Sequence, residues 1–112
     1  MNLKIAFIGY DEQQTHTYFR EMAELNKDQI KSYDPGQGRI VLLDGTEIFR
    51  VTPGARCFYI YLDQIIIADD RRRRCQVARF RELASLSYNL IRSRVPPELQ
   101  WQHYGLDAEV RA

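Results

Sequence analysis

Tyr61-Leu-Asp-Gln-Ile-Ile-Ile-Ala-Asp-Asp70 is the stretch of this 112-residue chain that decides the fold. Residues 62 to 68 are predicted to form a strand, because the apolar run Ile65–Ala68 is typical of a strand that is buried on both faces of a sheet, and two acids follow it directly. Leu3–Gly9 has the same character. The segment between the two runs is long enough for a crossover connection, so we expect the two strands to lie side by side and parallel.

The residues after the first strand predict a helix that ends near Asn26. Asp11 is a candidate N-cap, and Gln14 stands three residues later, at the capping-box position. Apolar side chains recur at helical spacing and predict one buried stripe, made of Tyr18, Phe19, Met22 and Leu25.

A β-hairpin is predicted next. Tyr33–Gly38 is a turn-rich break, and two strand-like runs then flank Asp44-Gly45 within Arg39–Val51. Asp-Gly between two such runs is a strong signal for a tight hairpin turn. Pro53-Gly54 closes this unit.

A second helix is predicted from Arg71 to Val95, where Pro96-Pro97 stops it. Its buried face is predicted from helical spacing, with further leucines that widen it: Val77, Phe80, Leu83, Ala84, Leu86, Tyr88, Leu90, Ile91 and Val95. The predicted fold is therefore α/β: one domain, 1–112, with a small mixed sheet, a β-hairpin insertion and two main flanking helices. Residues 1–95 form the core and 96–112 a C-terminal tail.

The composition and the motifs missing from the sequence limit the classes of function that we expect for this chain. Apolar residues make up 45% of the chain, which is enough for a packed core. The sequence shows no signal-peptide pattern and no apolar run near the ~20 residues that span a bilayer. We therefore expect a cytoplasmic protein with no membrane partner. Cys57 and Cys75 lack metal-ligand spacing, so neither a metal site nor a cofactor is predicted.

The positive charge is concentrated in one segment. Half of the 16 basic residues lie between Arg71 and Arg94, and all of these are arginines. Arginine suits bidentate contacts to phosphate. Candidate nucleic-acid contacts are Arg71, Arg72, Arg73, Arg74, Arg79 and Arg81. The alternative is a solvated helix face, which also accounts for Arg92 and Arg94.

The order of motifs resembles part of the phage terminase large-subunit ATPase, a P-loop family. The matching stretches are a strand and helix start, a hairpin, a turn, and a strand that ends in acids: Ile5–Gln14, Arg39–Ile48, Pro53–Arg56 and Ile65–Asp70. The resemblance implies a truncated P-loop-NTPase-like core, with Asp69 and Asp70 at the metal-binding and water-activating positions of a Walker B strand. It also implies a phage or prophage origin.

No catalytic residues are assigned. The sequence contains no G-x-x-x-x-G-K-[ST] loop to hold phosphates. Asp69 and Asp70 are weak candidates for a metal site and are more simply explained as caps of the helix that follows. The favoured function is a non-catalytic accessory protein that binds nucleic acid or a protein partner. The alternatives are an ATPase-related subunit completed by another chain and a homo-oligomeric structural module.

Self-association is a further expectation, and it concerns the end of the chain. The second predicted helix carries more apolar positions than one narrow stripe needs, and the tail adds others. The candidate interface residues of a homodimer are Leu90, Trp101, Tyr104 and Leu106. Alternatively, the tail folds back on the core of its own chain.

Overall fold

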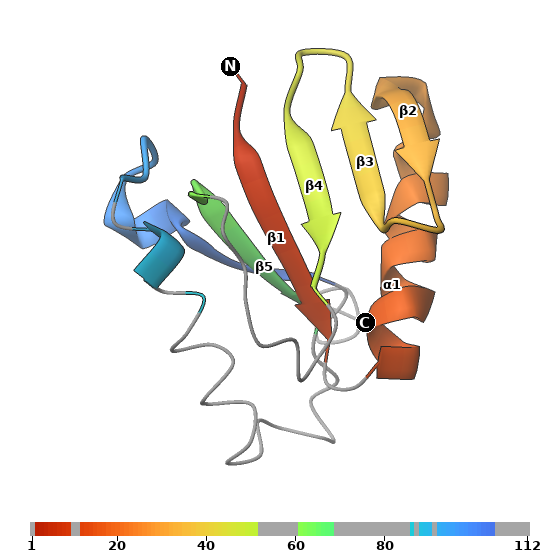
Figure 1. Ribbon diagram of the computed structural model, residues 1–112, viewed down its shortest axis with the longest axis horizontal. Coiled ribbons are helices and arrows are strands. Elements are labelled where there is room, and N and C mark those ends of the chain that lie inside the picture. The colour runs from red at the N-terminus through yellow and green to blue at the C-terminus, as the bar shows by residue number, and fades with distance from the viewer. Residues whose placement is uncertain are drawn as a thin grey trace, which may run out of the picture.

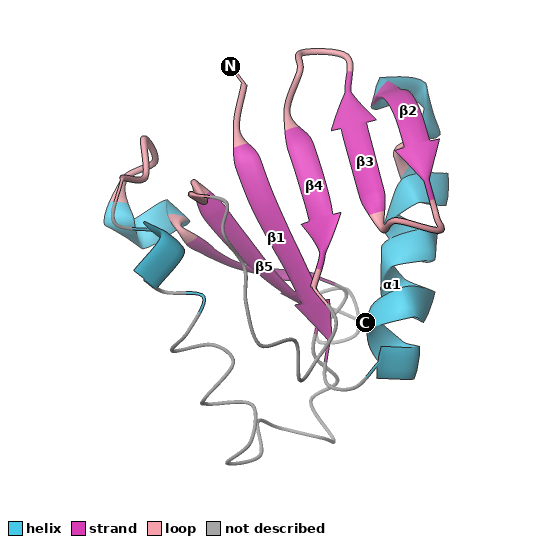
Figure 2. Cartoon of the chain, in the orientation of Figure 1, coloured by secondary structure: helices cyan, strands magenta, loops and turns pink. Residues whose placement is uncertain are grey.

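The computed structural model describes residues 2–9, 12–51, 61–68, 86, 88–90 and 92–104, with the backbone alone at 103 and 104. Its strands are β1 (Lys4–Gly9), β2 (Ile30–Asp34), β3 (Arg39–Leu42), β4 (Glu47–Arg50), β5 (Gln64–Ala68) and β6 (Trp101–Tyr104). They form one six-stranded sheet in the order β2-β3-β4-β1-β5-β6 (Figure 1). The helical elements are α1 (Glu12–Leu25) and the short 3-10 helices η1 (Lys27–Gln29), η3 (Tyr88–Leu90) and η4 (Pro97–Leu99) (Figure 2). The predicted α/β class with a mixed sheet is confirmed.

The two apolar strands that decide the fold lie side by side, as expected. β1 and β5 pair in parallel, with Gly9 opposite Ala68, and β1 pairs in parallel with β4 on its other side. Because side chains alternate along a strand, β1 supplies both faces of the sheet. Ile5 and Phe7 enter one apolar cluster, whereas Ala6 and Ile8 enter another.

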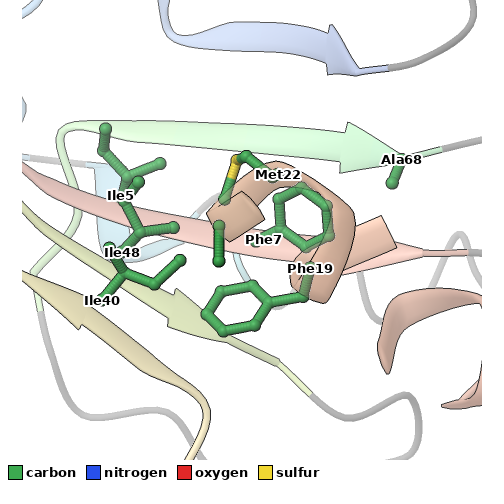
Figure 3. Packing of buried hydrophobic residues seen from close by; sticks show 8 residues of the cluster. Ile5, Phe7, Phe19, Met22, Ile40, Ile48 and Ala68 are labelled. Atoms are coloured by element: carbon green, nitrogen blue, oxygen red, sulfur yellow. The ribbon is translucent and has the colours of Figure 1, made fainter. Parts of the chain in front are cut away.

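α1 covers the face of the sheet that carries Phe7. The buried cluster between them consists of Ile5, Phe7, Phe19, Met22, Ala23, Ile40, Ile48 and Ala68 (Figure 3). Phe7 and Phe19 meet edge to face with ring centroids 5.5 Å apart. The inclusion of Leu25 in the buried stripe is wrong, because its side chain is 70% exposed. Six residues after Phe19, at about 100° per residue, Leu25 lies about 120° away around the helix.

The predicted hairpin is β3–β4. The two strands are antiparallel, with Ile40 opposite Ile48. Gly45 adopts a φ of 89°, a conformation that glycine tolerates and other residues rarely adopt. The side-chain Oδ1 of Asp44 accepts the N–H of Thr46 at 2.9 Å, which fixes the turn from the side chain as well.

β2 is missing from the sequence prediction, which placed Tyr33 and Asp34 in a turn. Both residues pair with β3, opposite Ile40 and Arg39. Ile30 is half-buried and the remaining residues of β2 are exposed, so the strand shows no alternation of apolar and polar side chains. Without that pattern, nothing in the sequence of β2 marks a strand.

The second apolar cluster covers the opposite face of the sheet and contains Ala6, Ile8, Val51, Leu62, Ile65, Ile67, Leu86 and Leu90. The prediction that a helix continues to Val95 is wrong. The chain is already a 3-10 turn at Tyr88–Leu90, and Tyr88, predicted to be buried, is 73% exposed. The reason is non-local hydrogen bonding: the carbonyl of Asn89 accepts the N–H of Leu62 at 2.7 Å, next to the start of β5.

The tail folds back on its own chain, which was one of the two alternatives. β6 pairs with β5 in parallel, with Trp101 opposite Ile65. The N–H of Ile65 donates to the carbonyl of Gln100 at 2.7 Å. Among the described residues, α1 is too short and too polar to cross a bilayer, and no other helix there could do so.

Candidate functional site

The weak candidates for a metal site come directly after β5 in the sequence, and β5 is one of the parallel strands. β1, β4 and β5 run in the same direction, so their carboxyl ends share one edge of the sheet, where ligands commonly bind in α/β proteins. Gly9 and Ala68 lie side by side at this edge. Asp69 and Asp70 come next in the sequence but lie outside the described residues. Their roles as metal ligands or as helix caps remain predictions.

The junction of β1 and α1 at this edge is tightly packed. The N–H of Gly9 donates to Oγ1 of Thr15 at 2.8 Å, and Thr15 is fully buried. A Cβ at Gly9 would lie 2.7 Å from that oxygen and 2.8 Å from the Thr15 Cα, so only glycine fits. The N–H that ends β1 is therefore used within the protein and does not point toward an anion.

The Arg-rich segment falls mostly outside the described residues. This applies to all six arginines proposed to contact nucleic acid: Arg71, Arg72, Arg73, Arg74, Arg79 and Arg81. Arg92 and Arg94 are described, and the assignment of these two to a helix face is wrong. The guanidinium carbon of Arg92 lies 4.9 Å from the ring centroid of Tyr61, a cation–π contact. Arg94 binds Asp63.

Asp63 and Arg94 form a bidentate pair, which we call the Asp63 clasp. Nε of Arg94 donates to Oδ1 of Asp63 at 3.1 Å, and Nη2 donates to Oδ2 at 2.9 Å. Backbone N–H groups of Arg94 and Lys4 donate to Oδ1 and Oδ2 at 3.0 and 2.9 Å. The hydrogen bonds from the Arg94 side chain are the main cause that lowers the pKa of Asp63 to about 2, although burial opposes this.

The clasp connects three parts of the chain. The start of β1 supplies the Lys4 N–H, and the carbonyl of Asn2 accepts a bond from Arg94 Nη2. Oγ of Ser93 donates to the carbonyl of Asp63 at 2.7 Å. Four N–H donors occupy the two carboxylate oxygens, and Asp63 is only 4% exposed. This arrangement fixes the segment before β6 and leaves no carboxylate lone pair for chemistry.

The candidate interface residues are placed differently from one another. Leu90 is buried in the second apolar cluster, so its side chain already packs within the chain. Trp101 is 37% exposed on β6. Tyr104 is the last residue of β6, described by its backbone alone, and Leu106 lies outside the described residues. Self-association through these residues stays a prediction.

An apolar pocket that the sequence analysis missed lies at the C-terminal end of α1. It encloses about 370 Å³ between the helix and β2, β3 and β4. The apolar lining consists of Met22, Ile30, Ile40, Leu42, Leu43 and Ile48. Leu43 stands at the tip of the β3–β4 hairpin and is 63% exposed. Its position beside Asp44-Gly45 was the available signal, because hairpin tips normally carry polar residues.

Polar residues also line this pocket, namely Asn26, Gln29 and Asp44. Both the backbone N–H and Nδ2 of Asn26 donate to the carbonyl of Met22, at 3.1 and 2.8 Å, and so cap the end of α1. The N–H of Leu43 donates to the carbonyl of Gln29 at 2.8 Å, which ties the hairpin tip to η1. These hydrogen bonds therefore hold the end of α1 and the hairpin tip in place on either side of the pocket.

Asp44 contributes a carboxylate to the lining of this pocket. Hydrogen bonds from Thr46, first from its backbone N–H and then from its side chain, lower the pKa of Asp44, and the N-terminal amino group is also among the groups that lower this pKa. The carboxylate is therefore ionised at neutral pH.

The described residues offer little for metal or acid–base chemistry. Across the described ranges, no three His, Cys, Asp or Glu side chains gather in a group that could hold a metal ion. Cys57 and Cys75 fall in the gaps between those ranges. His16 lies 4.0 Å from Glu12 on an exposed turn of α1, a separation that supports at most a weak ion pair when the imidazole is protonated.

Comparison with known proteins adds no assignment. The chain matches no family model, no curated protein and no solved structure.

Proposed function

We propose that this chain is a non-catalytic binding protein that docks a protein partner at the apolar pocket between α1 and the β3–β4 hairpin. The observation that carries this is an open apolar hollow of about 370 Å³ with exposed Leu43 on its rim. An exposed leucine beside an apolar hollow is typical of interaction surfaces, where a few buried anchors supply most of the affinity.

Two features of the described residues favour binding over catalysis. The carboxylate of Asp63 is saturated by N–H donors, and the N–H of Gly9 is bonded to Thr15. The sequence also lacks a phosphate-binding loop. The resemblance to the terminase core supports a phage or prophage accessory role for such a module, one that retains the order of elements without the nucleotide chemistry.

Nucleic acid is the second candidate partner, and the arginine-rich segment that follows β5 in the sequence supports it. Binding through phosphates should be micromolar or weaker and should fall steeply with salt. Joint replacement of Arg72, Arg74, Arg79 and Arg81 by Ala should abolish binding and leave the fold intact. A flat titration at low salt with single- and double-stranded oligonucleotides would remove this candidate.

The two remaining alternatives have direct tests. We expect the isolated protein to show no ATP turnover, because its sequence lacks a phosphate-binding loop. Magnesium-dependent turnover that is lost in Asp69→Asn would favour the ATPase alternative. For a homo-oligomeric module, sedimentation over a hundred-fold concentration range should show a rising mass that Trp101→Ala lowers. A constant monomer mass would rule it out.

A random peptide library displayed on phage tests the docking function directly. The wild-type chain should enrich peptides that are lost when Leu43→Glu is the bait, because a charge on the rim is incompatible with an apolar anchor. Leu99→Glu is the matched control, since it places the same charge on another exposed leucine, in η4. Enrichment that is equal on all three baits, or absent from all, would overturn the docking function.

A further inference from the structure

We propose that Tyr61, Tyr88 and Arg92 form a surface that binds single-stranded nucleic acid by stacking bases on the two tyrosine rings. We call it the tyrosine surface. None of the three residues lines the docking pocket, so this binding would be in addition to the docking of a protein. The tyrosine surface also gives nucleic acid, the second candidate partner, a place among the described residues.

Both tyrosines lie on the surface of the protein. Tyr61 is 56% exposed and Tyr88 is 73% exposed. A tyrosine ring offers a large apolar area that burial against other residues would stabilise. A single exposed tyrosine is ordinary, but two on adjoining segments form a patch that requires an explanation.

The fold brings the two tyrosines to adjoining segments of the chain. The N–H of Leu62, directly after Tyr61, donates to the carbonyl of Asn89, directly after Tyr88, at 2.7 Å. The short helix η3 therefore lies beside the start of β5 (Figure 1). Leu62 and Leu90 are both buried in the second apolar cluster and anchor these segments. Rings carried on an anchored backbone lose less conformational entropy when a ligand binds.

Arg92 supplies a cation beside one of the rings. Its guanidinium carbon lies 4.9 Å from the centroid of the Tyr61 ring, and the residue is exposed. A planar guanidinium stacks on bases and also binds phosphate in two-pronged fashion. An aromatic ring next to an arginine therefore matches a nucleotide, which presents a flat base and a phosphate together.

The charge of this part of the chain favours nucleic acid as the occupant. Residues 61–104, which carry the whole tyrosine surface, contain eight arginines against five acids, an excess of three positive charges. The rest of the chain has an excess of two negative charges. Tyrosine and arginine are also frequent in protein interfaces. The positive excess, however, is a general advantage only for a polyanion, because every phosphate that it neutralises releases counterions.

Stacking on these rings requires unpaired bases. In a duplex the faces of each base are covered by its neighbours, and a base reaches a protein ring only when it is flipped out of the helix. In a single strand the base faces are accessible, and every base has one, so little sequence preference is expected. The tyrosine surface should therefore contribute to the binding of single strands and not to the binding of duplexes.

Fluorescence anisotropy with the full chain at low salt tests this, using oligo(dT), oligo(U) and a DNA duplex of the same length. In the double variant Tyr61→Leu, Tyr88→Leu, single-strand affinity should fall at least about tenfold, because each stacked base is worth roughly fivefold or more. Any affinity for the duplex should stay within about twofold. The salt dependence of single-strand binding should not change, because no phosphate contact is lost. The tighter of the two single strands identifies DNA or RNA as the preferred class.

Two further variants separate stacking from other effects. Tyr33→Leu removes another exposed tyrosine, on β2 at the far edge of the sheet, and should leave binding unchanged. The double variant Tyr61→Phe, Tyr88→Phe keeps both rings and should bind single strands like the wild type.

The absence of binding to both single strands would overturn the proposed role of the tyrosine surface. The same holds if the double leucine variant weakens duplex binding equally, if Tyr33→Leu has the same effect, or if the phenylalanine variant also loses binding. Loss of peptides from the phage-displayed library in the double leucine variant, without oligonucleotide binding, would show that the surface contacts protein instead. Docking at the pocket is tested separately by Leu43→Glu, so either function can fail without the other.

Discussion

The two faces of the sheet are held by different kinds of interaction. On one face, α1 packs an apolar cluster against β1, the β3–β4 hairpin and the end of β5. On the other face, the segment from residue 88 to 104 is positioned by apolar contacts together with the Asp63 clasp, whose partners are 31 residues apart. The first arrangement is encoded by local periodicity. The second depends on a polar contact between residues that are far apart in the sequence, so no local sequence pattern predicts it.

The largest change in the free energy of unfolding is expected from a substitution on the sheet face that α1 covers. Phe19→Ala should lower the free energy of unfolding by about 3–5 kcal/mol, because it removes a fully buried ring that packs on Phe7. Leu25→Ala, which the sequence placed in the same stripe, should change it by less than about 0.5 kcal/mol because the side chain is exposed. Urea unfolding measures both. Similar losses in the two variants would contradict the observed packing of α1.

On the face that carries the Asp63 clasp, stability should depend on hydrogen bonds to the Asp63 carboxylate. Asp63→Ala leaves the N–H groups of Lys4 and Arg94 without their acceptor, and we expect a loss of about 2–3 kcal/mol. Asp28→Ala removes an exposed acid from η1 and serves as the control, with an expected change within about 0.5 kcal/mol. If urea unfolding finds the two variants equally stable, the clasp does not stabilise the C-terminal segment.

The clasp should also make stability depend on acid pH. The pKa of Asp63 is lowered from 3.8 to about 2 by its donors, so the carboxylate form is favoured in the folded state. The resulting stability is present above pH 3.8 and is lost as the pH falls through about 2. The expected loss from this group is at most about 2 kcal/mol.

Unfolding measured between pH 5 and pH 2 should therefore be less steep in pH for Asp63→Asn than for the wild type. The side-chain amide lacks the titrating carboxylate but keeps a similar shape. Identical pH slopes in the two proteins would contradict a lowered pKa at Asp63.

The contrast between the faces explains which parts of the structure could be predicted from the sequence. The parallel pairing of β1 and β5, the helix after β1 and the β3–β4 hairpin were predicted, since each follows from an apolar run, a 3.6-residue period or an Asp-Gly turn. β2 was missed because its exposed residues do not alternate. The helix was extended too far, to Val95, because its apolar spacing continues past the point where Asn89 bonds to Leu62.

The candidate sites also differ in whether a local sequence pattern could predict them. The Asp63 clasp was not predicted, since only the fold brings Arg94 to the start of β5. The pocket was also missed, because it forms where α1 ends above three strands and its lining is otherwise typical of a core. The roles proposed for Asp69, Asp70 and the arginines from Arg71 to Arg81 remain predictions.

A smaller effect is expected in the hairpin that forms one wall of the pocket. Gly45→Ala should lower the free energy of unfolding by about 1 kcal/mol, because Ala tolerates a φ of 89° poorly. Gly36→Ala is the control: the added Cβ would lie 3.4 Å from Oδ1 of Asp34, and Gly36 lacks a positive φ. A more stable Gly45→Ala protein would contradict the turn conformation.

The central claim is that the pocket between α1 and the hairpin is where a partner docks, and methyl NMR tests it most directly. A peptide that the wild-type chain enriches from the phage-displayed library would be titrated into the chain labelled at its Ile and Met methyl groups. We expect concentration-dependent shifts at Met22, Ile40 and Ile48, which line the pocket, and none at Ile65 and Ile67 on the opposite face. Shifts confined to Ile65 and Ile67, or a peptide that binds without moving the pocket methyls, would contradict it.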